Sequence, residues 1–199
     1  VMSGEFVEGC NKMDLVITTS EHSKKVMIDS VFEKRDEKTD QPIGQVKLEK
    51  PIEVLFEGFR SDVYKKLATI SGEVKSELSD ISEDFCYLFV GHWLQGNIGH
   101  DRKDIGMMIK TFCETFKRKP ASKRPALILK TSSSKFSIMD RNDIIQKIQS
   151  ITEPYGKSAP NIYLLHGDLT DKEMNDLYNH PKIKAMISFT HGEGFGRPL

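Results

Sequence analysis

The sequence has little cysteine, no surplus of charge and no long hydrophobic run. The three cysteines among its 199 residues (Cys10, Cys86 and Cys113) are far apart and lack metal-ligand spacing. This excludes a small disulfide-stapled protein and favours reduced thiols in a cytoplasmic setting. The 29 basic and 29 acidic side chains cancel, so we expect no nucleic-acid partner, because a general binder needs a basic surplus. No apolar run reaches the roughly 18–20 residues that cross a bilayer.

Several catalytic signatures are also missing. The chain contains no Walker phosphate loop, no Gly-x-Ser-x-Gly elbow and no His-Glu-x-x-His motif. Its histidines include no pair at helical metal-ligand spacing, so we expect no metal site. A dinucleotide-dependent oxidoreductase would need Gly-x-Gly-x-x-Gly after its first strand, and the residues after Val90 lack that pattern.

What the second half does contain is an alternation of two hydrophobic patterns. Short apolar runs predict buried strands over residues 85–90, 126–130, 162–165 and 185–189. Apolar spacings of three and four predict helices over residues 101–117, from about 140 and from 170. Asp101 is placed to cap the first helix, and Thr170 begins a capping box for the third. This repetition predicts an α/β fold with a Rossmann-like parallel sheet flanked by helices.

The first half is less regular. We expect strands over residues 14–18 and 53–56 and a helix over 21–32, with an exposed, charge-rich excursion over 33–50. Residues 60–82 are polar with a weak helical pattern, which suits an interdomain connection. The domain prediction is therefore a first domain over 1–58, a connection over 59–82 and a second domain over 83–199.

Ligands of open α/β sheets bind beyond the carboxyl ends of the strands, so the loops that follow the predicted strands are the places to search. After Val90, Arg102 and Lys103 fall in the first turn of a predicted helix, where the helix dipole disfavours cations. An anionic ligand would offset that penalty, and a solvated helix start is the alternative. Lys130 ends an apolar strand and points towards the same edge, unless it extends along the surface into solvent.

The last loop combines glycines with an acid. Glycines around Glu193, followed by Pro198, predict a strand, a glycine turn and a helix N-terminus whose free amides bind phosphate or hydroxyl groups. Glu193 would repel a phosphate, so we expect it to face a neutral or cationic group, or to lie exposed on a simple turn. Trp93 either covers a base or sugar ring or packs in the core. His166 and His191 follow strands. They either line a ligand-binding cleft at the strand ends or are histidines without a ligand, satisfied within the protein or solvated.

In this order the motifs resemble the donor-binding half of retaining nucleotide-sugar glycosyltransferases of the GT-B fold, family 4. The matching segments are Phe-Val-Gly at 89–91, Arg-Lys at 102–103, Leu-Lys at 129–130 and Gly-Glu-Gly-Phe-Gly-Arg-Pro-Leu at 192–199. Residues 14–25 and 54–59 resemble the end of the family's N-terminal domain. The resemblance covers most of the chain, and Gly-Glu-Gly-Phe-Gly is its most specific part.

The resemblance implies transfer of a hexose from a nucleotide-diphosphate sugar to a glycan, lipid or small-molecule acceptor, with retention of configuration and no required metal or other cofactor. It implies that Lys103 contacts the donor diphosphate beside Arg102, and that Glu193 is the catalytic carboxylate that reaches the sugar. The other donor-binding residues that it implies are Gly91, His92, Lys130, Gly194, Phe195 and Gly196. His92 stands where many family members have arginine. Arg102 and Lys103 would therefore supply more of the positive charge that contacts the diphosphate.

The family's sequences extend beyond this chain at both ends. The resemblance implies that the start of the N-terminal domain and the end of the C-terminal domain, with a partner glutamate beyond Leu199, are missing. We therefore expect an active parent and an inactive fragment, with any membrane association through the missing regions. A non-catalytic nucleotide- or sugar-binding Rossmann-like module is the alternative function.

Overall fold

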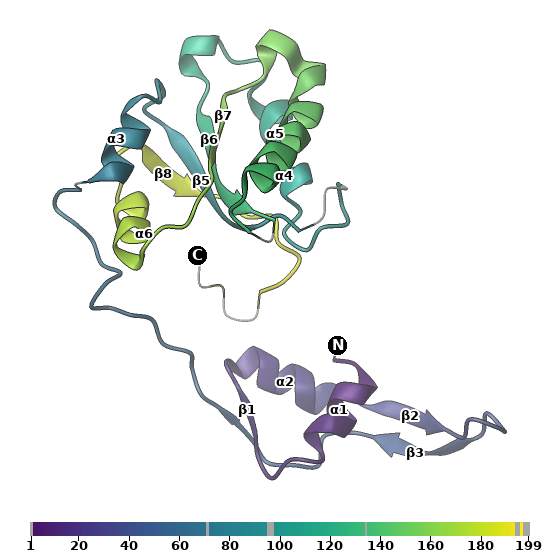
Figure 1. Ribbon diagram of the computed structural model, residues 1–199. Coiled ribbons are helices and arrows are strands. Elements are labelled where there is room, and N and C mark those ends of the chain that lie inside the picture. The colour runs from purple at the N-terminus through teal and green to yellow at the C-terminus, as the bar shows by residue number, and fades with distance from the viewer. Residues whose placement is uncertain (1, 71, 95–97, 134, 194–195, 197–199) are drawn as a thin grey trace. The chain divides into compact units, whose positions relative to one another are not determined.

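The computed structural model describes the chain except residues 1, 71, 95–97, 134, 194–195 and 197–199. The chain divides into two compact units, Val1–Gly58 and Phe59–Leu199 (Figure 1). In the part that the structure describes, no helix combines the length and the apolar character needed to cross a lipid bilayer.

The first unit contains short helices and two small sheets. Its elements are α1 (Gly4–Cys10), β1 (Val16–Thr18), α2 (Glu21–Asp29), β2 (Phe32–Arg35), β3 (Pro42–Val46) and β4 (Ile52–Val54). β1 pairs with β4 in parallel, and β2 pairs with β3 in antiparallel orientation. Ser20 caps α2, because its Oγ accepts a hydrogen bond from the backbone N–H of Ser23 at 3.1 Å. α2 ends earlier than predicted, since Phe32 already belongs to β2.

The exposed, charge-rich excursion predicted over residues 33–50 is largely a β-hairpin formed by β2 and β3, which the sequence analysis did not identify. Both strands are largely exposed, as the charged composition indicates. The turn between them is closed by Asp36, whose Oδ1 accepts hydrogen bonds from the backbone N–H groups of Lys38 and Thr39, both at 2.9 Å. The strands have no buried apolar face, so their sequence does not alternate between hydrophobic and polar residues. The hairpin could therefore not be predicted from hydrophobic periodicity.

The second unit is built on a four-stranded parallel sheet flanked by helices, as predicted. Its elements are α3 (Glu73–Ser79), β5 (Cys86–His92), α4 (Ile105–Phe116), η1 (Ala121–Lys123), β6 (Ala126–Ser132), α5 (Ile138–Thr152), η2 (Glu153–Ser158), β7 (Ile162–Leu165), α6 (Asp171–Tyr178) and β8 (Ile183–Met186). The strand order is β7-β6-β5-β8. The chain builds outward from β5 to β7 and then crosses to the other side of β5. The fourth strand starts and ends a few residues before the predicted range 185–189.

Helices cover both faces of this sheet. Figure 1 shows α4 and α5 on one side and α3 and α6 on the other. Phe89, Leu127 and Leu129 pack in the core with α4 and α5, whereas Leu88 and Ile128 pack in the core with α3 and α6. Because both faces are buried, the strands are continuous apolar runs rather than alternating ones.

The helix predicted over residues 101–117 begins later, at Ile105, and Asp101 does not cap it. Asp104 occupies the N-cap position with left-handed backbone (φ 46°), and its Oδ1 accepts a hydrogen bond from Gly99 N at 2.9 Å. The carbonyl of Asp101 instead accepts from the backbone N–H of Asp104 at 2.9 Å. The segment before α4 is therefore a turn that precedes the first helical residue.

The capping box predicted for the third helix is present at the start of α6. Thr170 Oγ1 accepts a hydrogen bond from the backbone N–H of Glu173 at 3.3 Å, and Glu173 Oε2 accepts one from the backbone N–H of Thr170 at 2.7 Å. Two amides that the helix leaves unpaired thus gain acceptors. This contact fixes where α6 begins, directly after the loop that follows β7.

We expect Thr170→Ala to lower the free energy of unfolding by about 1 kcal/mol, because an amide in the first turn of α6 loses its acceptor. Urea denaturation of the variant and the unaltered chain measures this difference. Thr115→Ala is the control, since the Thr115 hydroxyl donates only to the Thr111 carbonyl within α4. Equal destabilisation by the two substitutions would contradict the capping role.

Candidate functional site

The loops that follow β5 and β8 meet at the carboxyl edge of the sheet. β8 pairs in parallel with β5, on the side opposite β6. The strand order changes direction there, and such a switch point leaves a crevice where ligands of α/β proteins bind. The two loops are joined by a backbone hydrogen bond from His191 N to the Arg102 carbonyl at 2.9 Å.

Two cations from the first loop bind the acid from the second. Arg102 Nη1 donates to the Gly192 carbonyl at 2.7 Å and lies 3.3 Å from Glu193 Oε2. Lys103 Nζ forms an ion pair with Glu193 Oε1. The Lys103 side chain is 10% exposed and that of Arg102 is 61% exposed. Lys103 therefore holds the more desolvated of the two contacts.

Arg102 and Lys103 lie in the turn before α4, not in its first turn. The helix-dipole argument made from the sequence is therefore wrong for them. In the structure, the carboxylate of Glu193 lies against both positive charges. This acid therefore faces cationic groups, as the sequence analysis expected if it did not face a neutral group or lie exposed on a simple turn. Burial by itself raises the pKa of Glu193, but hydrogen bonds from Lys103 and other donors outweigh it and leave the pKa below its usual value. The carboxylate is thus held ionised.

Lys130 sits at the end of β6 and does not reach into solvent. It is 8% exposed, its Nζ donates to the Gly167 carbonyl, and the same atom lies 4.8 Å from the centre of the Phe136 ring. Burial lowers the pKa of Lys130, and the negative charge of Asp168 partly opposes that shift. Among the described residues this buried cation donates one hydrogen bond, to an uncharged carbonyl, which suits it to an anion.

A cavity of about 390 Å³ is lined by Arg102, Lys103 and Lys130, at the ends of β5 and β6 and the loop after β7, whereas Glu193 is not among its lining residues. Five of the residues predicted to bind the donor line it, namely Gly91, His92, Arg102, Lys103 and Lys130. His92 is held by a contact of 3.1 Å between its Nδ1 and Ser132 Oγ. The structure thus gathers around one hollow residues that the sequence places on separate loops.

Gly91 allows Lys103 to reach this cavity. A Cβ atom at position 91 would lie 3.0 Å from Phe89 Cζ and 3.4 Å from Lys103 Cε. The first distance is shorter than normal carbon contacts, so any side chain here would displace the aromatic ring or the lysine. The close approach of the Phe89 ring therefore favours glycine at this strand end.

Some residues of the cavity were not identified from the sequence. Phe136 and Asp168 follow β6 and β7 and line the cavity, so the rule that ligands bind at strand ends could have found them. Asp101 and Thr131 also line it, and among the described residues Asp101 Oδ2 and Thr131 Oγ1 are buried without a hydrogen-bond partner. Buried polar atoms of this kind call for an unseen partner such as a ligand or water.

The remaining candidates lie elsewhere. Trp93 is fully buried in the core with α4 and α5, so the core alternative is correct. His166 is buried and its Nε2 lies 2.8 Å from Asp140 Oδ2, whereas His191 is 61% exposed. Gly194 and Phe195 lie outside the described residues, and Gly196 is half-buried with φ 83°. Among the described residues, no group of three His, Cys, Asp or Glu side chains is placed to hold a metal ion.

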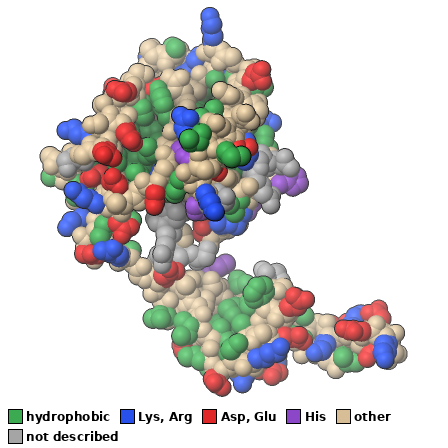
Figure 2. Space-filling view, viewed as in Figure 1, with side chains coloured by type: hydrophobic (Ala, Val, Ile, Leu, Met, Phe, Trp, Pro, Cys, Tyr) green, Lys and Arg blue, Asp and Glu red, His purple; other side chains and the backbone are tan. Residues whose placement is uncertain are grey.

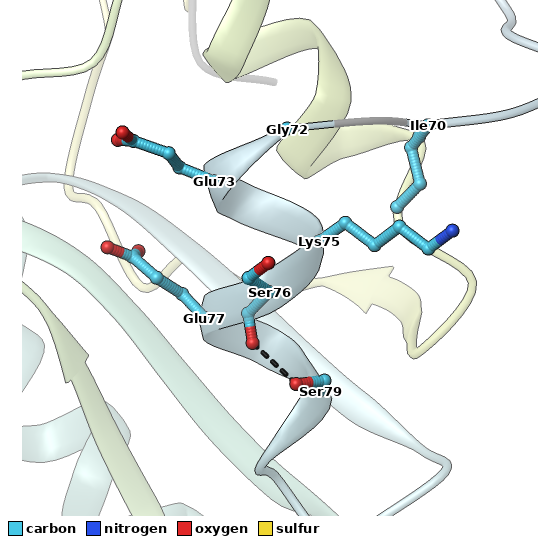
Figure 3. Close-up of a pocket in the computed structure, with 7 residues that line it drawn as sticks. All are labelled: Ile70, Gly72, Glu73, Lys75, Ser76, Glu77 and Ser79. Atoms are coloured by element: carbon cyan, nitrogen blue, oxygen red, sulfur yellow. Dashed lines mark hydrogen bonds between the residues drawn. The ribbon is translucent and has the colours of Figure 1, made fainter.

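A larger hollow of about 770 Å³ lies along α3 but lacks convergent chemistry. All of its lining comes from residues 70–79. Figure 3 shows Glu73 and Glu77 on one side of the helix and Lys75 on the other, while the Ser79 hydroxyl donates to the Ser76 carbonyl at 2.6 Å. Its side chains do not face a common ligand, so the smaller cavity is the candidate site.

No protein-family model and no curated protein matches the sequence. Solved structures do match. One, described as trehalose-6-phosphate from E. coli bound with UDP-2-fluoro glucose, is 16% identical, with a TM-score of 0.54 over 96% of this chain and 43% of that one. Another, trehalose-6-phosphate synthase OtsA, is 14% identical, with a TM-score of 0.55 over 96% of this chain and 42% of that one.

At such low identity the likeness is one of fold. The parallel sheet flanked by helices matches these GT-B glycosyltransferase structures. The chain spans less than half the length of either solved structure.

We expect Glu193→Gln to raise the affinity of this chain for inorganic pyrophosphate about five- to tenfold, because a neutral amide no longer competes for Lys103 and Arg102. Titration calorimetry measures the affinity. Glu8→Gln is the matched control, since it removes a carboxylate paired with Lys34 at 3.0 Å in the first unit. An affinity that is unchanged by Glu193→Gln would contradict the competition between Glu193 and an anion.

Proposed function

We propose that this chain is the donor-binding part of a cytoplasmic, retaining hexosyltransferase of the family 4 type, which moves a sugar from a nucleotide-diphosphate sugar to an acceptor. The observation that carries the proposal is the meeting of Arg102, Lys103 and Glu193 beside one cavity at the switch point of the sheet. The fold shared with a structure bound with UDP-2-fluoro glucose supports a nucleotide-sugar donor.

The charges of the site suit a diphosphate. A nucleoside diphosphate ester brings about two negative charges, and Glu193 adds a third. Arg102, Lys103 and Lys130 supply three positive charges around the same cavity, whose lining also includes the acids Asp101 and Asp168. As the bond to the sugar breaks, negative charge grows on the departing diphosphate. Cations already held in place stabilise that charge without reorganisation.

Glu193 has a different part in this scheme. In the chain without donor it pairs with both cations. A diphosphate that binds the cations takes the place of the carboxylate and frees it to accept hydrogen bonds from hydroxyls of the attached sugar. One acid thus keeps the cations in position before binding and contacts the sugar afterwards. The backbone amides of residues 194–196 supply further donors in this proposal.

The proposal also assigns the parts of the chain. Residues 83–199 are the donor domain, 59–82 the interdomain connection and 1–58 a remnant of the acceptor domain. The acceptor is a glycan, a lipid or a small molecule. The three cations supply the charge that neutralises the diphosphate, so no step is assigned to a metal.

We expect Lys103→Ala to weaken binding of UDP to this chain about ten- to a hundredfold, because a desolvated charge-assisted hydrogen bond is lost. Titration calorimetry at constant salt measures it. Lys75→Ala on α3 removes a lysine that does not line the site cavity and should leave the affinity unchanged. If the chain bound UDP and both variants bound it equally well, Lys103 would have no role in donor binding.

Catalysis and simple binding are separated by turnover in the full-length parent. With a panel of nucleotide sugars, we expect Glu193→Gln to lower kcat at least about a hundredfold without weakening the binding of the nucleoside diphosphate. NMR of the product's anomeric centre tests retention of configuration. A parent that binds nucleotide sugars but transfers none of them would instead be a non-catalytic binding module.

A further inference from the structure

Large hydrophobic side chains are exposed where α5 begins. Phe136, Ile138 and Met139 are 45%, 80% and 83% exposed, and every residue from 135 to 139 is exposed. Single exposed hydrophobic residues are ordinary on protein surfaces, whereas a contiguous group marks a binding surface.

The charges around this group are positive. Lys135 and Arg141 flank it, are both exposed, and form no ion pair or hydrogen bond through their side chains with any residue that the structure describes. Asp168, which lines the cavity together with Phe136, faces the charge of Lys130. The other two acids nearby also have partners. Asp140 is buried against Ser133 and His166, and Asp143 forms an ion pair of 2.6 Å with a lysine one helical turn later. An anionic partner would therefore meet free positive charge on both flanks.

The surface borders the cavity of the candidate site. Phe136 belongs to both, and Leu94, which is 65% exposed, lines the cavity from the loop after β5. Figure 2 shows hydrophobic and basic side chains side by side on the surface of this unit. A partner bound here would sit at the mouth of the cavity.

The size of the surface distinguishes between partners. A stable interface between proteins takes roughly 800 Å² from each side, supplied by about 20–30 residues. Three hydrophobic side chains and two cations fall well short of that. They suit a smaller contact with a membrane surface, in which a few apolar side chains enter the headgroup region and each cation gains about 1 kcal/mol from anionic lipids.

We propose that Lys135, Phe136, Ile138, Met139 and Arg141 form a contact site for an anionic lipid surface. The hydrophobic side chains enter the interface while the two cations contact the headgroups. This places a membrane contact on the chain itself, whereas the sequence alone pointed only to missing regions. The lipid contact site does not depend on sugar transfer, so its test is independent of the proposed function.

Vesicle sedimentation tests the site with the complete 199-residue chain. One set of vesicles is phosphatidylcholine, and the other is equal parts phosphatidylcholine and phosphatidylglycerol. We expect binding to the anionic vesicles, weaker binding at high salt, and little binding to the neutral ones. Replacing both Ile138 and Met139 by serine, or both Lys135 and Arg141 by glutamine, should lower binding to anionic vesicles at least about tenfold.

Ile43→Ser is the matched control, because Ile43 is 59% exposed on the hairpin of the first unit. It should bind anionic vesicles as the unaltered chain does. Absence of binding by the unaltered chain, equal binding to the two kinds of vesicle, or full binding by either double variant would overturn the proposal. So would a lipid-free chain that is oligomeric and becomes monomeric in the Ile138→Ser, Met139→Ser variant, since the surface would then join copies of the chain.

Discussion

The parallel pairing of β8 with β5 is the constraint on which the candidate site depends. The first three strands of the second unit are added in one direction, and β8 then takes the free side of β5. The loops that follow β5 and β8 consequently start from neighbouring strand ends and contact each other. If β8 did not lie beside β5, the loops that carry Arg102 and Glu193 would not be neighbours. The pairing of these two strands thus brings the acid of one loop to the two cations of the other, beside the cavity.

The electrostatics of the site follow from that placement. Lys103 and Lys130 are each only 8% exposed, and a buried ammonium group needs a partner in the absence of water. Glu193 is the partner of Lys103, and the backbone carbonyl of Gly167 is the partner of Lys130. Both partners are exchangeable, because a ligand with anionic oxygens offers the same contacts. The ligand-free site is therefore held together by contacts that a diphosphate can replace.

The sequence predicted the second unit well and the first unit less well, for one physical reason. Where both faces of a sheet are covered, apolar runs such as Leu127–Leu129 have little alternative to burial. The hairpin around Asp36 is held by polar turn contacts and backbone pairing, which leave no hydrophobic period. The start of α4 was misplaced because Asp101 resembles a cap in sequence, while the turn that delays the helix to Ile105 involves a left-handed Asp104 that sequence patterns do not reveal.

The candidate residues of the site were likewise found in part. Local patterns in the sequence placed Arg102, Lys103 and Glu193 after strands and Lys130 at the end of a strand, because strand ends and glycine turns can be recognised from such patterns. Only the tertiary structure decided that Glu193 binds both cations, that Trp93 is core, and that side chains at the start of α5 stay exposed. Local patterns determine which segments become strands and helices. Which side chains pair with one another depends on contacts between segments far apart in the chain. Those contacts exist only once the sheet has formed.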